Sequence, residues 1–526
     1  MITGKNLIGY KLSGEGLDTF KSYNPHLEKE NPTVFFDASL SEIEEAVLLA
    51  SKAFQQYQFF TAEQKLKFFQ ALENEMLEAK KSILTCYQLE SGLPLSRSES
   101  EFSRTIAQIQ QYSKLFDSNQ LILPSIDTAI YDTHQPKSDI RKIKVGLGPV
   151  VVFGASNFPL AYSTLGGDTV AALAAGCSVI VKSHPMHAGT GELVGNAIIK
   201  ALKYAEMPEG VFSNLNGFSN NVGACLVNHP MIKAVAFTGS IKGGRALFDL
   251  AARRKEPIPV FAEMGSLNPV VIDNLSLLKN MNKWTDDLAD SVTNDAGQFC
   301  TKPGLIFIKS GQNVDEFVQM LISKVKEKGF KMMVHPRLKG NFENQLDDLS
   351  KILNIERHKL HSSSVVMPLA INISGSLFLT HRIFQEEVFG PFCFVIICKD
   401  DAELIQCIES LDGQLTASIF VEDEFQNESI VKQWISIFYN KSGRINFNNV
   451  PTGVRVCGSM HHGGPYPASS DSRFGAVGVD SIERFLRPLC FQNFPDALLP
   501  DLLKDKNPLN VLRRVNGELS FAEIIR

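Results

Sequence analysis

The chain has 526 residues, enough for roughly two to four domains and a large buried core, which excludes a peptide hormone or a small disulfide scaffold. Hydrophobic residues make up 44% and charged residues 21%, the balance of an ordinary globular protein rather than a disordered or fibrous one. The formal net charge of −5 comes without long blocks of one sign, so nucleic acid is not expected as a partner.

The N-terminal sequence, MITGKNLIGYKLSGEG, lacks the basic patch and apolar stretch of a secretory signal, and a cytoplasmic protein is the default expectation. The charge-free stretch from Val145 to Gly167 is broken by glycine, asparagine and proline, so we expect strand and loop there and no membrane span. Nine cysteines without a CxxC pair fit neither a disulfide framework nor a zinc ribbon. We expect most of them to be reduced and buried.

Two amphipathic helices are predicted near the start of the chain. Ser41 and Glu44 form a capping-box pattern ahead of apolar residues at helical spacing, so the first helix should begin at Ser41. The second should begin at about Glu63 and stop at Ser91-Gly92, because glycine commonly ends a helix.

From residue 149 onward, short apolar runs alternate with helical patterns. This alternation predicts a parallel, doubly wound α/β sheet, followed by a second α/β domain that extends to Asn446. Residues 121–142 are polar and contain two prolines, and we expect an extended excursion between two halves of the first domain. The apolar tail from Ile482 could dock on a neighbouring subunit or on its own chain, and both alternatives stay open.

Two segments at predicted strand ends suit a phosphate-containing ligand. The segment from Phe237 to Arg245, with Gly239, Ser240 and Gly244, joins a strand to a helix, where backbone amides and the helix dipole can hold a pyrophosphate. Because it lacks the GxGxxG pattern, a merely tight connection is the alternative. Lys182 ends another strand, either at the ligand-binding edge of an open sheet or as an ordinary surface lysine.

Three further residues have side chains suited to catalysis. Cys300 follows the small, polar segment NDAGQF, which suits an accessible thiol nucleophile better than a packed side chain, although most cysteines are simply packed. Glu263 ends an apolar strand, where partial burial should raise its pKa towards that of a general base, unless it lies at the surface. Asn157 follows a strand and can offer its amide to an oxyanion or cap a turn.

Taken together, these motifs resemble the aldehyde dehydrogenase superfamily. They occur in the family's order over roughly residues 20–490: GASNFP, SVIVK, FTGS, the strand end at Glu263, GQFC and EEVFGP. The resemblance implies a Rossmann-type doubly wound cofactor-binding domain from residues 1–120 and 143–262, and an α/β catalytic domain from 263–447. It further implies that residues 121–142 and 482–526 form a small oligomerisation element of a homodimer or homotetramer.

The resemblance also implies a thioester mechanism. Cys300 attacks the aldehyde, and Asn157 together with the Cys300 backbone amide holds the resulting oxyanion. Hydride then passes to a nicotinamide, and Glu263 activates the water that hydrolyses the thioester. Glu263 counts against a coenzyme A-acylating enzyme, which characteristically lacks this base, and the presence of Cys300, Glu263 and Asn157 together disfavours a silent binding protein with the same fold.

For the cofactor, the resemblance implies that Glu387 and Lys182 hold ribose hydroxyls, that Phe389 flanks the nicotinamide ring, and that Ser240 meets the pyrophosphate.

Many NAD-preferring members carry a glutamate three residues after the strand-end lysine, but this chain has Lys182-Ser183-His184-Pro185. With no carboxylate there to repel a 2′-phosphate, and with Ser183 or His184 available to donate to it, we expect NADP, while use of NAD stays open.

The C-terminal part departs from the common family pattern. The usual PFGGxKxSG is replaced by PTGVRVC from residue 451 and HGGPYPA from residue 462. Together with DSRFGAVG and the tail, this resembles the 2,5-dioxovalerate (α-ketoglutaric semialdehyde) dehydrogenase branch, whose product is 2-oxoglutarate. A related branch that oxidises long-chain (fatty) aldehydes with NADP is the alternative, and it predicts an apolar substrate tunnel.

A substrate with a distant carboxylate needs a cation, ideally an arginine. Arg104 is the first candidate, with Gln108 one turn later on the same helix face, and Arg455 is the second. A solvated helix charge or an interface salt bridge is the alternative for either arginine. No metal site is predicted, because the adjacent His461 and His462 should point apart and no acidic pair stands at ligand spacing.

Overall fold

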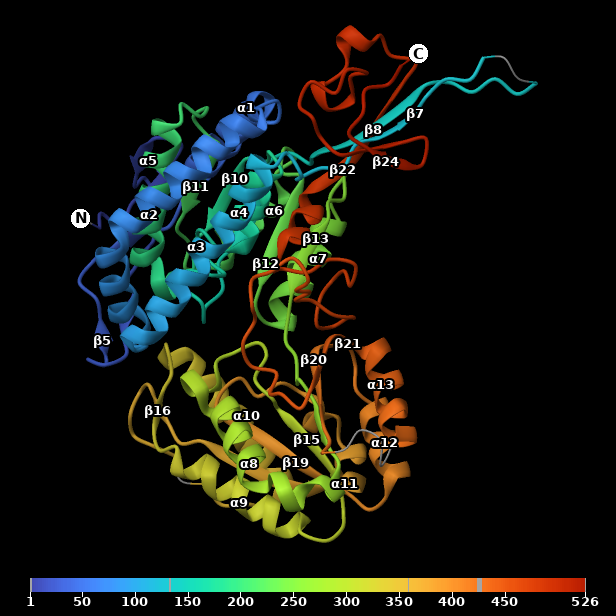
Figure 1. The fold of residues 1–526 in the computed structure, drawn as a ribbon. Helices are drawn as coiled ribbons and strands as arrows, with labels where there is room; N and C mark the ends of the chain where they lie inside the picture. The colour runs from blue at the N-terminus through green and yellow to red at the C-terminus, as the bar shows by residue number, and fades with distance from the viewer. Residues whose placement is uncertain (1, 132–133, 358, 423–427, 526) are drawn as a thin grey trace.

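The computed structural model describes residues 2–131, 134–357, 359–422 and 428–525, which form two α/β lobes and an extended arm (Figure 1). The first lobe is built on a seven-stranded sheet in the order β13-β12-β9-β10-β11-β1-β2. Its strands are β1 (Asn6–Ile8), β2 (Lys11–Ser13), β9 (Val150–Phe153), β10 (Val179–Lys182), β11 (Phe212–Leu215), β12 (Ala234–Thr238) and β13 (Val260–Glu263). Because β9 pairs in parallel with both β10 and β12, the sheet is doubly wound, as predicted.

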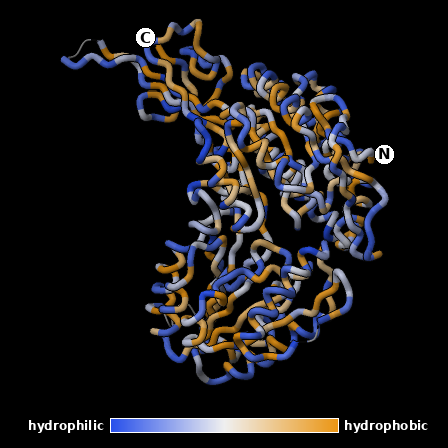
Figure 2. The backbone as a smooth tube through the Cα atoms, turned by 180° about the vertical axis from the view of Figure 1, so that it is seen from behind, coloured by the Kyte–Doolittle hydropathy of each residue, from blue (hydrophilic) through white to orange (hydrophobic). Residues whose placement is uncertain are grey.

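Helices cover both faces of this sheet, and the strand residues alternate between them. Val150 and Val152 belong to the core that also contains residues of α2, α3, α4 and α5, whereas Val151 packs in the core with α1, α6 and α7. The helices are α1 (Leu40–Tyr57), α2 (Ala62–Ser91), α3 (Leu95–Asp117), α4 (Gly167–Ala174), α5 (Ala188–Tyr204), α6 (Asn220–Asn228) and α7 (Ile241–Ala252). Figure 2 shows the apolar strands inside and polar segments outside.

The predicted start of the first helix is wrong, because a different serine caps it. Ser39, not Ser41, caps α1: its hydroxyl accepts from the amide of Glu42, and the Glu42 carboxylate accepts from the amide of Ser39. Both pairs have the same spacing, and Ser39-Glu42 is selected because it lets Glu42 also bind Asn6 of β1. The end of α2 is as predicted, with Gly92 in the left-handed conformation at φ 66°.

The second lobe contains a six-stranded sheet in the order β18-β19-β15-β14-β20-β21, with parallel neighbours throughout. Its strands are β14 (Val270–Ile272), β15 (Leu305–Lys309), β18 (Leu369–Ser374), β19 (Phe392–Cys398), β20 (Gln414–Phe420) and β21 (Ser442–Phe447). One face packs against α8 (Leu277–Thr293) and α9 (Val314–Glu327), and the other against α10 (Pro336–Leu353), α12 (Asp401–Glu409) and α13 (Glu428–Lys441).

The arm is a third sheet, in the order β22-β8-β7-β23-β24. The segments expected to be extended, 121–142 and the tail, meet here: β22 (Leu486–Gln492) runs antiparallel to β8 (Ile140–Gly146). The remaining strands are β7 (Ser125–Asp127), β23 (Arg513–Val515) and β24 (Glu518–Ser520). The tail therefore packs on its own chain; residues 132 and 133 of the excursion lie outside the described residues.

The carboxyl edge of the first sheet lies across the cleft from the amino edge of the second sheet. Asn157, Lys182, Ser240 and Glu263 follow or end strands of the first sheet, at its carboxyl edge. Cys300 and Glu387, in contrast, precede β15 and β19 at the amino edge of the second sheet. Among the helices that the structure describes, none has both the length and the apolar character needed to cross a bilayer.

Candidate active site

A cavity of about 460 Å³ lies between the two lobes. It is lined by seven of the residues singled out from the sequence: Asn157, Gly239, Ser240, Glu263, Cys300, Glu387 and Phe389. Cys300 comes to the cavity on a tight turn, in which Asp295, Ala296 and Gly297 have φ of 44°, 57° and 64°. Such left-handed geometry costs roughly 1–3 kcal/mol for a residue other than glycine, and strain of this kind clusters at functional sites.

Two asparagines hold the nucleophile loop. Asn268 donates from Nδ2 to the carbonyl oxygens of Cys300, at 2.7 Å, and Lys302, at 2.9 Å. Asn157 donates from Nδ2 to the carbonyl oxygen of Gln298 at 2.9 Å. One amide hydrogen of Asn157 is thereby fixed, and the second is available beside the half-buried Cys300 thiol.

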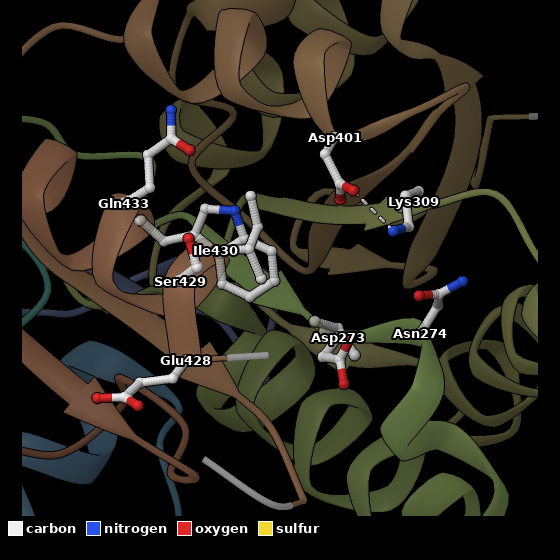
Figure 3. A pocket seen from close by; sticks show the side chains of 10 residues that line it. Asp273, Asn274, Lys309, Asp401, Glu428, Ser429, Ile430 and Gln433 are labelled. Carbon is white, nitrogen blue, oxygen red and sulfur yellow. Dashed lines mark hydrogen bonds and ion pairs between the residues drawn. The ribbon is translucent and has the colours of Figure 1, made fainter. Parts of the chain in front are cut away.

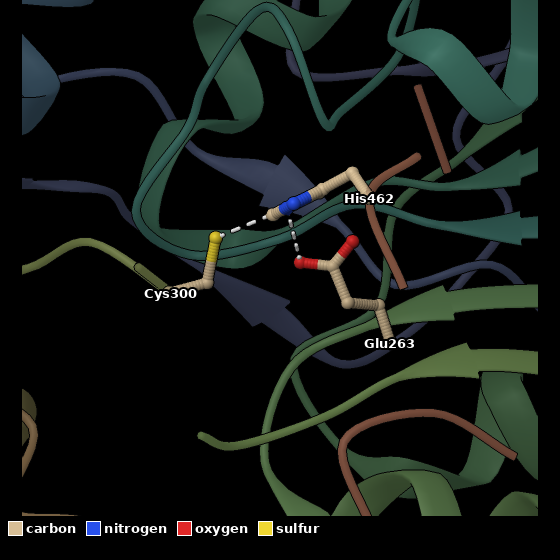
Figure 4. Close-up of side chains that lie close together, drawn as sticks. All are labelled: Glu263, Cys300 and His462. Atoms are coloured by element: carbon tan, nitrogen blue, oxygen red, sulfur yellow. Dashed lines mark hydrogen bonds and ion pairs between the residues drawn. The ribbon is translucent and has the colours of Figure 1, made fainter. Parts of the chain in front are cut away.

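Glu263 and Cys300 share an unforeseen neighbour, His462. Its Nε2 lies 3.0 Å from Glu263 Oε1 and 3.4 Å from Cys300 Sγ (Figure 4). His462 is brought in because the segment carrying it pairs with β13: the amide of Met264 donates to the carbonyl of Ala468 at 2.8 Å.

This neighbour reverses the expected pKa shift of Glu263. Burial is the largest influence and would raise the pKa of the Glu263 carboxyl, but His462, Cys300 and Arg104 together hold that pKa below its ordinary value. The expectation of a raised pKa was wrong because the sequence did not reveal the histidine. Burial, together with the Glu263 carboxylate, raises the pKa of the Cys300 thiol well above its ordinary value.

Two residues of the glycine-rich turn after β12 have different functions, one in capping α7 and one in packing. Ser240 is the N-cap of α7 and accepts from the amide of Gly243 at 3.1 Å, which leaves the first turn of the helix facing the cavity. Gly244 serves packing: a Cβ there would lie 2.6 Å from Sδ of Met264, so glycine lets α7 approach β13 closely. Gly244 is absent from the cavity lining that the structure describes.

Lys182 lies beside the cleft without lining the cavity. Its Nζ donates to the carbonyl of Gly217, and burial lowers its pKa to about 8. Ser183 is 1% exposed. His184 is more accessible: Nδ1 accepts from the amide of Met186 at 3.3 Å, which leaves Nε2 for another partner. Burial, followed by the charges of His187 and Lys182, lowers the pKa of His184 well below its ordinary value.

The EEVFGP loop is held by a buried lysine. Lys302 donates from Nζ to the carbonyl oxygens of Val388, at 3.1 Å, and Phe392, at 2.8 Å. Burial lowers the pKa of Lys302 to about 8 and raises that of Glu387 to about 7. Both Glu387 and Phe389 line the cavity, so this one lysine positions two residues predicted to touch the cofactor.

A model of the aldehyde dehydrogenase family matches residues 12–337 and 377–487, most of the chain. The chain belongs to the aldehyde dehydrogenase family. It is therefore an aldehyde-oxidising oxidoreductase that uses NAD(P). The α-ketoglutaric semialdehyde dehydrogenase of Acinetobacter baylyi is 40% identical to it over 526 residues, covering 98% of this chain and 99% of that protein. α-Ketoglutaric semialdehyde dehydrogenase 2 of Azospirillum brasilense is 38% identical over 523 residues, with 98% and 99% covered.

Solved structures support the fold of the dehydrogenase. A 1-pyrroline-5-carboxylate dehydrogenase matches it with a TM-score of 0.78 at 22% identity, over 93% of this chain and 92% of its own. Betaine aldehyde dehydrogenase from Staphylococcus aureus, in complex with NAD+, matches with a TM-score of 0.78 at 20% identity, over 94% and 96%.

A second, outer cavity of about 720 Å³ adjoins the first, since Phe158 lines both, and Phe299, the residue before Cys300, lines the outer one. Arg104 projects towards it, donating from Nη2 to the hydroxyl of Tyr162 at 2.6 Å. Among the described residues, Arg104 forms no salt bridge, and its buried Nε has no hydrogen-bond partner. The neighbouring Arg97, by contrast, is neutralised by Glu101 at 3.0 Å and Asp295 at 2.6 Å.

Arg455 and Gln108, the other two residues predicted to bind the substrate carboxylate, lie in different places. Arg455 lines the outer cavity and is exposed. Gln108 is 3% exposed and lies against Gly167, and it lines neither of these two cavities as the structure describes them. No role is predicted from the sequence for Lys302, and His462 is considered there only as a rejected metal ligand. Lys302 stands two positions after the cysteine, and His462 stands in the segment that departs from the family pattern, so both carried a signal.

A third hollow, of about 260 Å³, lies at the carboxyl edge of the second sheet (Figure 3). Its charged groups Lys309 and Asp401 are paired at 2.9 Å. We assign this hollow no role.

Proposed function

We propose that the dehydrogenase oxidises 2,5-dioxopentanoate to 2-oxoglutarate, with NADP as the preferred cofactor. The observation that carries the substrate is Arg104, a cation without a carboxylate partner in the described structure, in the outer cavity beside Cys300. An arginine in this position suits the distant carboxylate of the substrate. The names of the two relatives above support the same aldehyde.

The proposed chemistry begins at Cys300. Its sulfur, after loss of the thiol proton, adds to the aldehyde carbon, and the oxygen becomes an oxyanion held by the Asn157 amide and the Cys300 backbone amide. A nicotinamide cofactor held in the inner cavity would supply the acceptor for hydride from the same carbon, and loss of this hydride leaves a thioester on Cys300. Water then attacks the thioester, Glu263 accepts the water proton, and the carboxylate leaves as the thiolate is restored.

The residues around the inner cavity fit a dinucleotide. The capped N-terminus of α7 at Ser240 suits a pyrophosphate, and the carboxylate of Glu387 suits ribose hydroxyls. Lys182 is proposed for a ribose hydroxyl as well. The preference for NADP rests on the absence of a carboxylate from Lys182-Ser183-His184-Pro185, and the free Nε2 of His184 makes it the stronger of the two phosphate candidates.

The fatty-aldehyde alternative is disfavoured by the outer cavity. Phe158, Phe299, Val454 and Val456 give this cavity apolar walls, but Arg104 and Arg455 line it as well. An alkyl chain bound there would remove these charges from water without pairing them, whereas a carboxylate would pair with them.

The proposal is tested by steady-state oxidation of 2,5-dioxopentanoate, hexanal and decanal, each with NADP and with NAD. We expect the highest kcat/KM for 2,5-dioxopentanoate with NADP. A preference for decanal would overturn the substrate, and equal or better use of NAD would overturn the cofactor preference.

We propose further that copies of the dehydrogenase associate through the arm. Leu519 of β24 and Phe521 beyond it are 58% and 53% exposed at the edge of the arm sheet, where a second copy would cover them. Light scattering of the full chain should give a dimer or a tetramer, and a monomer at micromolar concentration would contradict this.

A further inference from the structure

Cys300, His462 and Glu263 form a compact cluster of one sulfur, one nitrogen and one oxygen ligand atom. These atoms all lie within 4.8 Å of one another. The sequence predicts no metal, because His461 and His462 should point apart and no acidic pair stands at ligand spacing; His462, 162 residues from Cys300, becomes its neighbour only in the fold. We infer that these three side chains form a Zn²⁺ site whose occupation blocks the nucleophile.

The spacing of the cluster suits a tetrahedral ion. Zinc–sulfur distances of about 2.3 Å and zinc–nitrogen or zinc–oxygen distances of about 2.0 Å require sulfur–nitrogen and nitrogen–oxygen separations of roughly 3.5 and 3.3 Å. Two of the three observed separations match, 3.4 Å from Sγ to Nε2 and 3.0 Å from Nε2 to Oε1, and the sulfur and the carboxylate oxygen lie within 4.8 Å of each other. Three protein ligands leave the fourth position open towards the cavity that Cys300 and Glu263 line.

The Glu263 carboxylate is available to bind such an ion. Glu263 is 5% exposed, and within the described structure neither of its oxygens accepts a hydrogen bond of acceptable geometry. His462 is 1% exposed, so both groups sit in surroundings of low polarity. A thiolate and a carboxylate together neutralise the two charges of Zn²⁺, which removes the penalty of burying an isolated charge.

Binding converts the Cys300 thiol to a zinc-bound thiolate and releases its proton to solvent; His462 coordinates through neutral Nε2 with its proton on Nδ1. No electron is transferred. The bound sulfur can no longer add to an aldehyde, so Zn²⁺ inhibits the oxidation, and a chelator restores it.

The test uses the purified full chain, freed of metal and cofactor, so that it does not depend on turnover or on the identity of the aldehyde. Zn²⁺ is titrated against a chromophoric chelator, and Co²⁺ serves as a spectroscopic probe. We expect one tight ion per chain, a thiolate-to-cobalt charge-transfer band, and protection of Cys300 from alkylation.

Variants separate this site from other thiols. Cys300→Ser should abolish the cobalt band, and His462→Ala and Glu263→Gln should each weaken binding by roughly 100-fold, the upper end of the loss expected even for an outer-shell partner. Cys490→Ser, which removes an exposed thiol, should change neither binding nor activity. Circular dichroism verifies folding, and His462→Gln replaces His462→Ala if the latter unfolds. Unchanged affinity in folded His462 and Glu263 variants, or a cobalt spectrum without a thiolate band, would overturn the site.

Discussion

Cys300 and Glu263 are close together but are proposed to act in successive steps, which allows their contributions to be separated. The thiol forms the bond to the aldehyde carbon, whereas the carboxylate is needed only when water attacks the thioester. Both side chains contact Nε2 of His462, but they reach it from different elements. Each can therefore be replaced without removing the other's contact.

Substitutions of Cys300 and Glu263 should affect different steps of the reaction. Cys300→Ala should abolish oxidation while leaving NADP binding intact, as measured by calorimetry. Glu263→Gln should keep a rapid first turnover of reduced cofactor but lower the steady-state rate by about 10²- to 10⁴-fold, the range for loss of a general base. A Glu263→Gln enzyme that loses both phases equally would show that the carboxylate acts before the thioester forms.

Arg104 provides a second prediction at the same scale. Arg104→Leu should lower kcat/KM for 2,5-dioxopentanoate by roughly 10- to 100-fold, because a hydrogen bond to a charged group contributes about 1.5–3 kcal/mol. Hexanal, which has no carboxylate, should be oxidised nearly as before. Arg455→Leu is the matched control, since it removes an exposed charge from the same outer cavity. Equal losses for both aldehydes would remove Arg104 from substrate recognition.

At the scale of elements, the loop before β19 carries Glu387 and is held by Lys302, which reaches it from the segment before β15. Lys302 anchors the loop through two carbonyl oxygens, and Glu387 stands at its tip beside the cavity. Burial penalises both charged forms, so each pKa moves towards neutrality.

This loop predicts a pH dependence of cofactor binding. The pKa of Glu387 is raised from 4.5 to about 7, so the carboxylate is protonated below that pH and loses its capacity to accept from a ribose hydroxyl. KM for NADP should therefore rise as pH falls, by roughly tenfold between pH 8 and pH 6. Initial rates at several NADP concentrations measure this, with Glu387→Gln as the control that should be pH-independent over the same range. A flat profile in the wild type would contradict the role of Glu387.

The elements also show what could be predicted from the sequence. Apolar runs such as Val150–Phe153 indicated parallel strands, and Gly92 marked a helix end, because these depend on local patterns. The capping box at Ser41 was wrong because two equally spaced Ser–Glu pairs differ only in the tertiary contacts of the glutamate. His462 could not be assigned to Glu263, because their proximity comes from pairing between segments about 200 residues apart.

At the scale of the whole molecule, the arm encloses two fully buried arginines, Arg141 and Arg513, and the first of them joins its two parts. Arg141 of β8 is bound to Asp139 at 2.8 Å, to Asp505 at 2.6 Å and to the carbonyl of Leu503, so it ties the first part of the arm to the tail. Breaking a buried pair by removing one partner is strongly destabilising, because the opposite charge stays behind.

Arg141→Met should therefore lower the free energy of unfolding of the arm by about 3–5 kcal/mol. Urea denaturation of the full chain measures this as an early transition. Arg487→Met, an exposed arginine on the paired strand β22, should have little effect. An unchanged transition in Arg141→Met would show that the tail is held by its apolar contacts alone.

The segment that carries His462 joins the first lobe only after the chain has passed through the whole second lobe. During synthesis, a ribosome that has produced Glu263 and Cys300 has yet to produce the segment around Ser469 that forms a bridge to Glu263. The nascent enzyme therefore stays without its histidine until about nine-tenths of the chain exists, and a prematurely terminated product has an incomplete site. The active site can therefore be completed only when translation of the chain is nearly complete.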